Sequence, residues 1–73
     1  MREYRFTLAI PRERFLLYYE GQAQAVVATT WGGTRVRFPA RYLRPFVEHR
    51  GVYGQFVLIT DDRNKFVGLH RLR

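Results

Sequence analysis

Apolar and polar residues alternate along the first ten positions of this chain. Tyr4, Phe6, Leu8 and Ile10 occupy every second position, and charged, polar or small residues stand between them. Successive side chains of a strand point to opposite faces of the sheet, so this period of two predicts a strand with one buried face. A chain that begins in this way must fold around a sheet whose apolar face the remaining residues cover.

A short helix is expected after this strand. Pro11 ends the ladder pairing and suits the first turn of a helix. Residues 11–20 carry a short apolar stripe, formed by Phe15, Leu16 and Tyr19. Gly21 follows at the position where a helix C-terminus favours a left-handed residue, so the helix is expected to end there.

The middle of the chain predicts a hairpin. Residues 25–31 are rich in β-branched side chains, and residues 34–38 alternate arginine with apolar residues. Gly32 and Gly33 stand between the two segments and favour a two-residue turn in which both residues have positive φ. Pro39 ends the second strand, and residues 40–44 are expected to form a helical turn that Pro45 limits.

A second hairpin is expected near the C-terminus. Strands over residues 53–60 and 65–72 flank the sequence Asp-Asp-Arg-Asn, which has turn chemistry, and Asn64 tolerates left-handed geometry. Gly51, Gly54 and Gly68 are the places where a strand would bend most easily.

These elements predict one domain over residues 1–73 without a linker. The fold class is mostly β with one short helix. Five short strands in so small a chain cannot bury both faces of an open sheet, so we expect them to form a small antiparallel barrel or a strongly curled sheet. An SH3-like or Sm-like barrel is the nearest architectural analogy, with the helix packed across one open end.

The charge balance is the most unusual bulk property. Thirteen Lys and Arg residues against six Asp and Glu give a net charge of +7, and Lys65 is the only cation that is not arginine. Such an excess of positive charge indicates a polyanionic partner.

The amino-acid composition does not favour an enzyme. The chain has neither cysteine nor serine, which removes two common nucleophiles and thiolate metal sites. His49 and His70 do not have the spacing of a metal site, and Asp61 and Asp62 fit a turn better than an acid–base pair. We therefore expect no catalysis, no cofactor and no metal.

The sequence favours a cytoplasmic protein that does not enter a membrane. It contains no cysteine and no apolar run of the length that spans a bilayer. Its N-terminal segment alternates charged and apolar residues, unlike the apolar region of a signal peptide.

The candidate binding residues lie in one basic segment. No acidic residue occurs between Glu20 and Glu48, yet four arginines do. Strand spacing places two of them on one face, and helical spacing does the same for the other two. Guanidinium groups bind phosphates and aromatic rings stack on unpaired bases. The predicted nucleic-acid site therefore comprises Arg35, Arg37, Arg41 and Arg44, with Tyr42 and Trp31 at its margin.

Three interpretations of this segment stay open. RNA or single-stranded nucleic acid is favoured, because no helix is long and basic enough to enter a DNA major groove. An acidic protein partner or self-assembly is the alternative. In the third interpretation the arginines only keep the sheet soluble, Arg44 pairs with Glu48, and Tyr42 and Trp31 belong to the core.

Four segments together resemble a known family. They are FPARYLRPFVEHRGVYGQF at residues 38–56, YRFTLAI at 4–10, YYEG at 18–21 and NKFVGLHRL at 64–72. This order of motifs is similar to the bacterial family designated domain of unknown function 2835, which occurs mainly in gamma-proteobacteria such as pseudomonads. The resemblance implies a compact cytoplasmic bacterial protein and brings no catalytic residue, ligand or activity.

Overall fold

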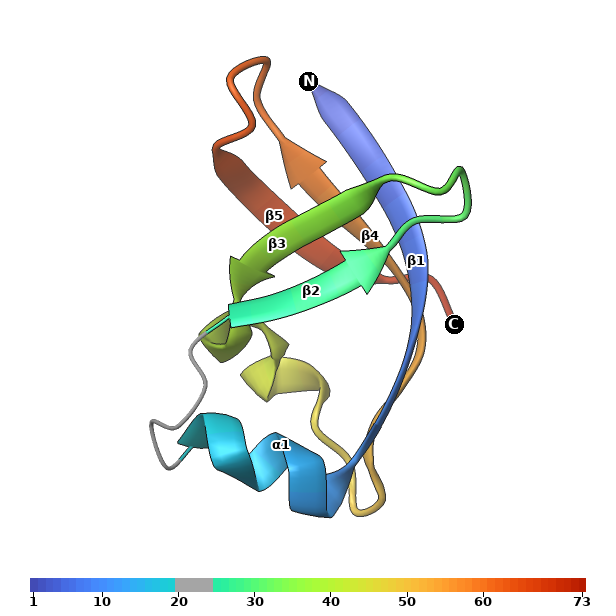
Figure 1. The fold of residues 1–73 in the computed structure, drawn as a ribbon, viewed down its shortest axis with the longest axis vertical. Coiled ribbons are helices and arrows are strands. Elements are labelled where there is room, and N and C mark those ends of the chain that lie inside the picture. Colours follow the sequence, from blue (N-terminus) through green and yellow to red (C-terminus); the bar gives the residue numbers. More distant parts are fainter. Residues whose placement is uncertain (20–24) are drawn as a thin grey trace.

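The computed structural model describes residues 1–19 and 25–73, and of residues 17–19 it describes only the backbone. Five strands and two short helical segments follow one another along this part of the chain (Figure 1). In order, they are β1 (Arg2–Pro11), α1 (Arg12–Tyr19), β2 (Ala25–Thr29), β3 (Arg35–Pro39), the 3₁₀ helix η1 (Ala40–Phe46), β4 (Gly51–Thr60) and β5 (Phe66–Arg71).

The strands form two antiparallel sheets. β1, β4 and β5 make a three-stranded sheet with β4 in the centre, and β2 pairs only with β3. The β2–β3 hairpin crosses one face of the larger sheet, and α1 lies at one end of the molecule (Figure 1). The prediction of a mostly β fold with one short helix is confirmed.

The described strands do not close into a barrel. The β2–β3 hairpin is tied to β1 by a backbone hydrogen bond, in which the Trp31 N–H donates to the Arg5 carbonyl at 2.9 Å, and not by a continuous ladder. It buries its apolar face by packing on the larger sheet, which makes edge-to-edge closure unnecessary. The predicted barrel is therefore not confirmed, and the SH3-like or Sm-like comparison stays an analogy.

The alternation in β1 is confirmed. Phe6 and Leu8 are buried, whereas the neighbouring Arg5 and Thr7 are exposed. Pro11 differs from expectation, because it is the last residue of the ladder and pairs with Gly51. A proline is tolerated at a strand end, where its missing N–H costs no ladder bond.

The helix after β1 is confirmed, and it begins at Arg12. The backbone N–H of Arg12 donates to the Arg50 carbonyl at 2.9 Å, which fixes the start of α1 against the turn before β4. Phe15 is buried, whereas Leu16 is exposed. The predicted end of the helix at Gly21 lies outside the described residues.

The turn of the first hairpin is longer than predicted. The Gly33 N–H donates to the Thr30 carbonyl, and the Thr30 N–H donates to the Thr34 carbonyl, so three residues form the loop. Within this loop, Gly33 has a positive φ, of 93°, and Gly32 does not. The expected two-residue turn is wrong, because the Thr30 hydroxyl accepts a hydrogen bond from the Thr34 N–H and stabilises the wider loop.

The second hairpin repeats this hydrogen-bond pattern. The Asn64 N–H donates to the Asp61 carbonyl, and the Asp61 N–H donates to the Lys65 carbonyl. Asn64 has a φ of 62°, as predicted. The Asp61 carboxylate accepts hydrogen bonds from the N–H groups of Arg63 and Lys65, which is the role of a turn residue.

Aromatic rings join the two sheets. Phe6 is fully buried and its ring lies 5.7 Å from that of Phe38 and 6.2 Å from that of Phe56, measured between ring centroids. The 3₁₀ helix closes the same core through the buried Leu43 and through Phe46, which meets Phe56 edge to face. The core therefore holds β3 and η1, which carry the candidate site, in a fixed place.

Candidate nucleic-acid interface

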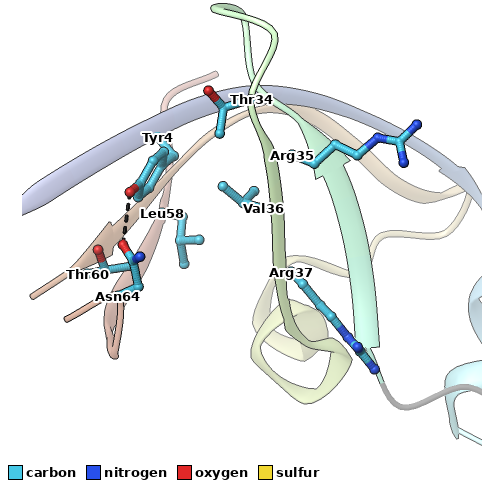
Figure 2. Close-up of a pocket in the computed structure, with 8 residues that line it drawn as sticks. All are labelled: Tyr4, Thr34, Arg35, Val36, Arg37, Leu58, Thr60 and Asn64. Atoms are coloured by element: carbon cyan, nitrogen blue, oxygen red, sulfur yellow. Dashed lines mark hydrogen bonds between the residues drawn. The ribbon is translucent and has the colours of Figure 1, made fainter.

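Arg35 and Arg37 share the outer face of the β2–β3 hairpin. Both are exposed, and the buried Val36 between them points the opposite way, toward Leu58 (Figure 2). The residues paired with the two arginines on β2 are Thr29 and Val27, which are also exposed. The predicted sharing of one face is therefore observed.

Three acidic side chains of the described residues form ion pairs with groups other than Arg35 and Arg37. Glu3 accepts a hydrogen bond from Arg5, and the Met1 ammonium lies 3.2 Å from Asp62. Glu48 binds Arg71 with 2.6 Å between the charged atoms. Among the described residues, neither Arg35 nor Arg37 has a carboxylate partner.

Arg41 and Arg44 lie on η1, which follows β3 directly along the chain. A 3₁₀ helix has three residues per turn, so side chains three positions apart stand above one another. Both arginines are exposed. Arg37 and Arg41 also line one shallow hollow, whose floor is formed by Ala25, Phe38 and Pro39. We call the set of Arg35, Arg37, Arg41 and Arg44 the arginine strip.

Tyr42 does not offer a ring face to a ligand. Its half-buried ring stacks on Phe66 with 3.7 Å between centroids and an interplanar angle of 8°. The guanidinium of Arg41 lies over the same ring, 4.9 Å from its centroid, and so must occupy the other face. Tyr42 thus acts as a platform that orients Arg41.

Trp31 lies at the other end of the hairpin. It belongs to the loop between β2 and β3, whereas η1 follows β3. Its indole N–H donates to the Thr7 hydroxyl at 3.1 Å, and 57% of the residue remains exposed. The structure therefore separates Trp31 from Arg41, and the Trp31 side chain lies beside β1 and stays partly exposed.

A cleft between the two sheets was not anticipated from the sequence. It has a volume of about 220 Å³, and one wall is formed by the consecutive residues 34–37, which are the end of the hairpin loop and the first part of β3. The other wall comes from the larger sheet and its last loop, with Tyr4, Leu58, Thr60 and Asn64 on it (Figure 2).

The polar end of this cleft is fixed by Asn64. Its side-chain oxygen accepts hydrogen bonds from the Tyr4 hydroxyl at 3.0 Å and from Arg2 at 3.4 Å. Tyr4 and Asn64 are 60 positions apart in the chain, so only the register of the sheet brings them together. The sequence marked Asn64 as a turn residue and gave no sign of this contact.

Two further properties concern the described residues, 1–19 and 25–73. No three histidine, aspartate or glutamate side chains gather there as a metal ion would require. Neither helical segment is long and apolar enough to cross a membrane.

Comparison with known proteins gives one match. Curated proteins and solved structures yield no similar chain. A protein-family model covers residues 2–72, which is nearly the whole chain, as the order of the four motifs predicted. The chain therefore belongs to the family described as protein of unknown function (DUF2835).

Proposed function

We propose that this protein binds single-stranded nucleic acid, RNA above all, by contacting the phosphate backbone with the arginine strip. The observation that carries the proposal is the placement of Arg35 and Arg37 on one exposed face without a carboxylate partner among the described residues. Phosphates along a strand repeat at a short interval, and each can accept two hydrogen bonds from one guanidinium. The arginine strip supplies four guanidinium groups for such contacts.

The contacts of the aromatic residues refine this proposal. The ring faces of Tyr42 are covered by Phe66 and Arg41, so the ring supports a phosphate contact indirectly. Trp31 is the aromatic side chain on which a base could stack, beside the Arg35 end of the strip. We propose that binding is non-catalytic, takes place in the cytoplasm and depends little on base sequence, because phosphate contacts carry no sequence information.

Charge reversal of Arg35 and Arg37 tests this function. We expect the double variant R35E/R37E to bind a fluorescent single-stranded RNA at least about tenfold more weakly at low salt, measured by anisotropy. The slope of log affinity against log salt should fall by about 1.4, because each single-strand phosphate contact contributes about 0.7.

A matched control keeps the net charge equal. The double variant R63E/K65E changes two exposed cations of the β4–β5 loop at the same spacing. Each pair of reversals lowers the net charge by four, from +7 to +3. If both double variants lose the same affinity, or if the native protein does not bind RNA at low salt, the proposed function is wrong.

A protein partner is the second candidate function. One specific observation favours it: the β3 edge that forms the cleft wall carries backbone groups without partners among the described residues. An exposed edge of this kind can pair with an added strand.

A further inference from the structure

We infer that the free edge of β3 captures an extended acidic peptide of another protein, with acidic residues at two alternate positions and one aliphatic residue between them. This inference gives the second candidate function its partner class. It does not depend on RNA binding, although both surfaces use Arg35 and Arg37.

The hydrogen-bond pattern of the hairpin shows which backbone groups are available. Thr30 and Thr34 form a hydrogen-bonded pair, and such pairs recur at every second position of an antiparallel ladder. Val36 and Phe38 therefore direct their N–H and C=O groups to β2. Arg35 and Arg37 direct theirs away from β2, toward the cleft. No described residue bonds these groups.

The cleft lies where a third strand of the small sheet would run. Residues 34–37 line one side of it, with the Val36 side chain directed toward Leu58, and Tyr4, Leu58, Thr60 and Asn64 line the other side. Figure 2 shows these four side chains on the side of β3 opposite to the guanidinium groups. A strand added here would pair with Arg35 and Arg37 and cover the apolar side of Tyr4.

The two faces of β3 define what the added strand should carry. Residues opposite Arg35 and Arg37 would place their side chains on the outer face, next to the two guanidinium groups. The residue opposite Val36 would place its side chain in the cleft, against Tyr4 and Leu58. The segment that fits this edge therefore carries an acidic, an aliphatic and an acidic residue at three successive positions.

A second copy of this chain does not fit the edge. Antiparallel pairing of two β3 strands about Val36 would set Arg35 of one copy opposite Arg37 of the other, and like charges directly opposite destabilise a sheet. The chain also has no two acidic residues separated by one position. The occupant we expect is therefore a different, acidic protein segment.

A synthetic peptide tests the inference directly. The probe is fluorescent, blocked Thr-Thr-Glu-Val-Glu-Thr-Thr, and the control is Thr-Thr-Val-Glu-Glu-Thr-Thr, which has the same composition without the alternation. We expect the native protein to bind the probe at least about tenfold more tightly than the control, measured by anisotropy. Equal binding of the two peptides would overturn the inference, as would no binding of the probe up to about 1 mM.

Two variants distinguish the contribution of the backbone N–H of residue 37 to peptide binding from that of the arginine charge. Arg37→Pro removes the N–H that faces the cleft, which an edge strand tolerates, and Arg37→Thr removes the same charge but keeps the N–H. We expect the proline variant to bind the probe at least about tenfold more weakly than the threonine variant. RNA affinity should fall equally in both, since each loses one guanidinium. Equal peptide binding by the two variants would overturn strand addition.

Two further measurements keep the result unambiguous. If the proline variant does not fold by circular dichroism, a probe N-methylated at its second Glu removes the equivalent hydrogen bond from the peptide side and should bind at least about tenfold more weakly than the probe.

Sedimentation of the native protein tests whether a second copy of the chain occupies the edge. A dimer that the Arg37→Pro change alone dissociates would assign the edge to a second copy and overturn the acidic partner. Loss of RNA binding with peptide binding intact would refute only the proposed function.

Discussion

Replacing Gly51 by alanine should destabilise the protein by about 3 kcal/mol or more. A Cβ atom at this position would lie 2.1 Å from the Ile10 carbonyl oxygen and 2.8 Å from the backbone nitrogen of Arg12. Both neighbours are backbone atoms, so no side-chain rotation can relieve the overlap. Gly51 also has a φ of 130°, which L residues rarely adopt. A thermal melt should show a fall in Tm of about 12 °C or more.

Alanine variants of two other glycines distinguish the cost of a positive φ from the cost of a steric overlap. Gly33 has a φ of 93° but no atom near the position of its Cβ, so Gly33→Ala should cost only about 1–2 kcal/mol. Gly32 has neither feature and its alanine variant should stay within about 0.5 kcal/mol of the native protein. If Gly51→Ala melts no lower than Gly33→Ala, the close approach of β4 to the start of α1 is not a source of stability.

Gly51 matters because it sits where three segments meet. It pairs with Pro11 at the end of β1, and it closes the turn from η1 by exchanging backbone hydrogen bonds with Glu48. Arg50, one residue earlier, holds the start of α1. A side chain at position 51 would push β1, η1 and α1 apart together.

Local patterns in the sequence were sufficient for the strands and their faces. The alternation of Phe6 and Leu8 with Arg5 and Thr7 identified the buried face of β1, and the same reasoning placed Arg35 and Arg37 outward. These predictions succeeded because the direction of a side chain on a strand depends only on its position.

Local sequence patterns could not predict whether the two sheets close into a barrel or pack face to face. A barrel and two packed sheets bury the same apolar faces, so the pattern of hydrophobic residues does not distinguish them. The difference depends on whether the edges of β1 and β2 pair, and among the described residues two hydrogen bonds from Trp31, to the Arg5 carbonyl and the Thr7 hydroxyl, stand in place of that ladder. The length of the loop between β2 and β3 was missed for a similar reason, because the hydrogen bond from the Thr34 N–H to the Thr30 hydroxyl stabilises three loop residues instead of two.

The candidate site was predicted in part. The four arginines were identified by the absence of acidic neighbours in the sequence, which is a local property. The place of Tyr42 depends on Phe66, which the sheet brings beside it, so the sequence could not show that the tyrosine ring is covered. The cleft beside β3 depends in the same way on contacts between distant segments.

Phe6 is the residue that links this surface to the rest of the fold, and Phe6→Ala should cost about 3–5 kcal/mol. The ring is fully buried between Phe38 of the hairpin and Phe56 of the larger sheet, so its removal leaves a cavity where the sheets meet. A small domain has a stability of about 5–15 kcal/mol, so this variant loses a large fraction of it. Denaturant unfolding followed by circular dichroism measures the loss.

A Phe6→Leu variant distinguishes the contribution of apolar volume to stability from that of the ring contacts. Phe6→Leu keeps an apolar side chain and should cost about 1–2 kcal/mol, while the exposed Val67→Ala should cost within about 0.5 kcal/mol. A double-mutant cycle between Phe6 and Phe38 should give a coupling of about 1 kcal/mol, because the two rings stack across the sheets. A coupling near zero would mean that the hairpin is held on the larger sheet by other contacts. The fixed direction of Arg35 and Arg37 would then not depend on this aromatic core.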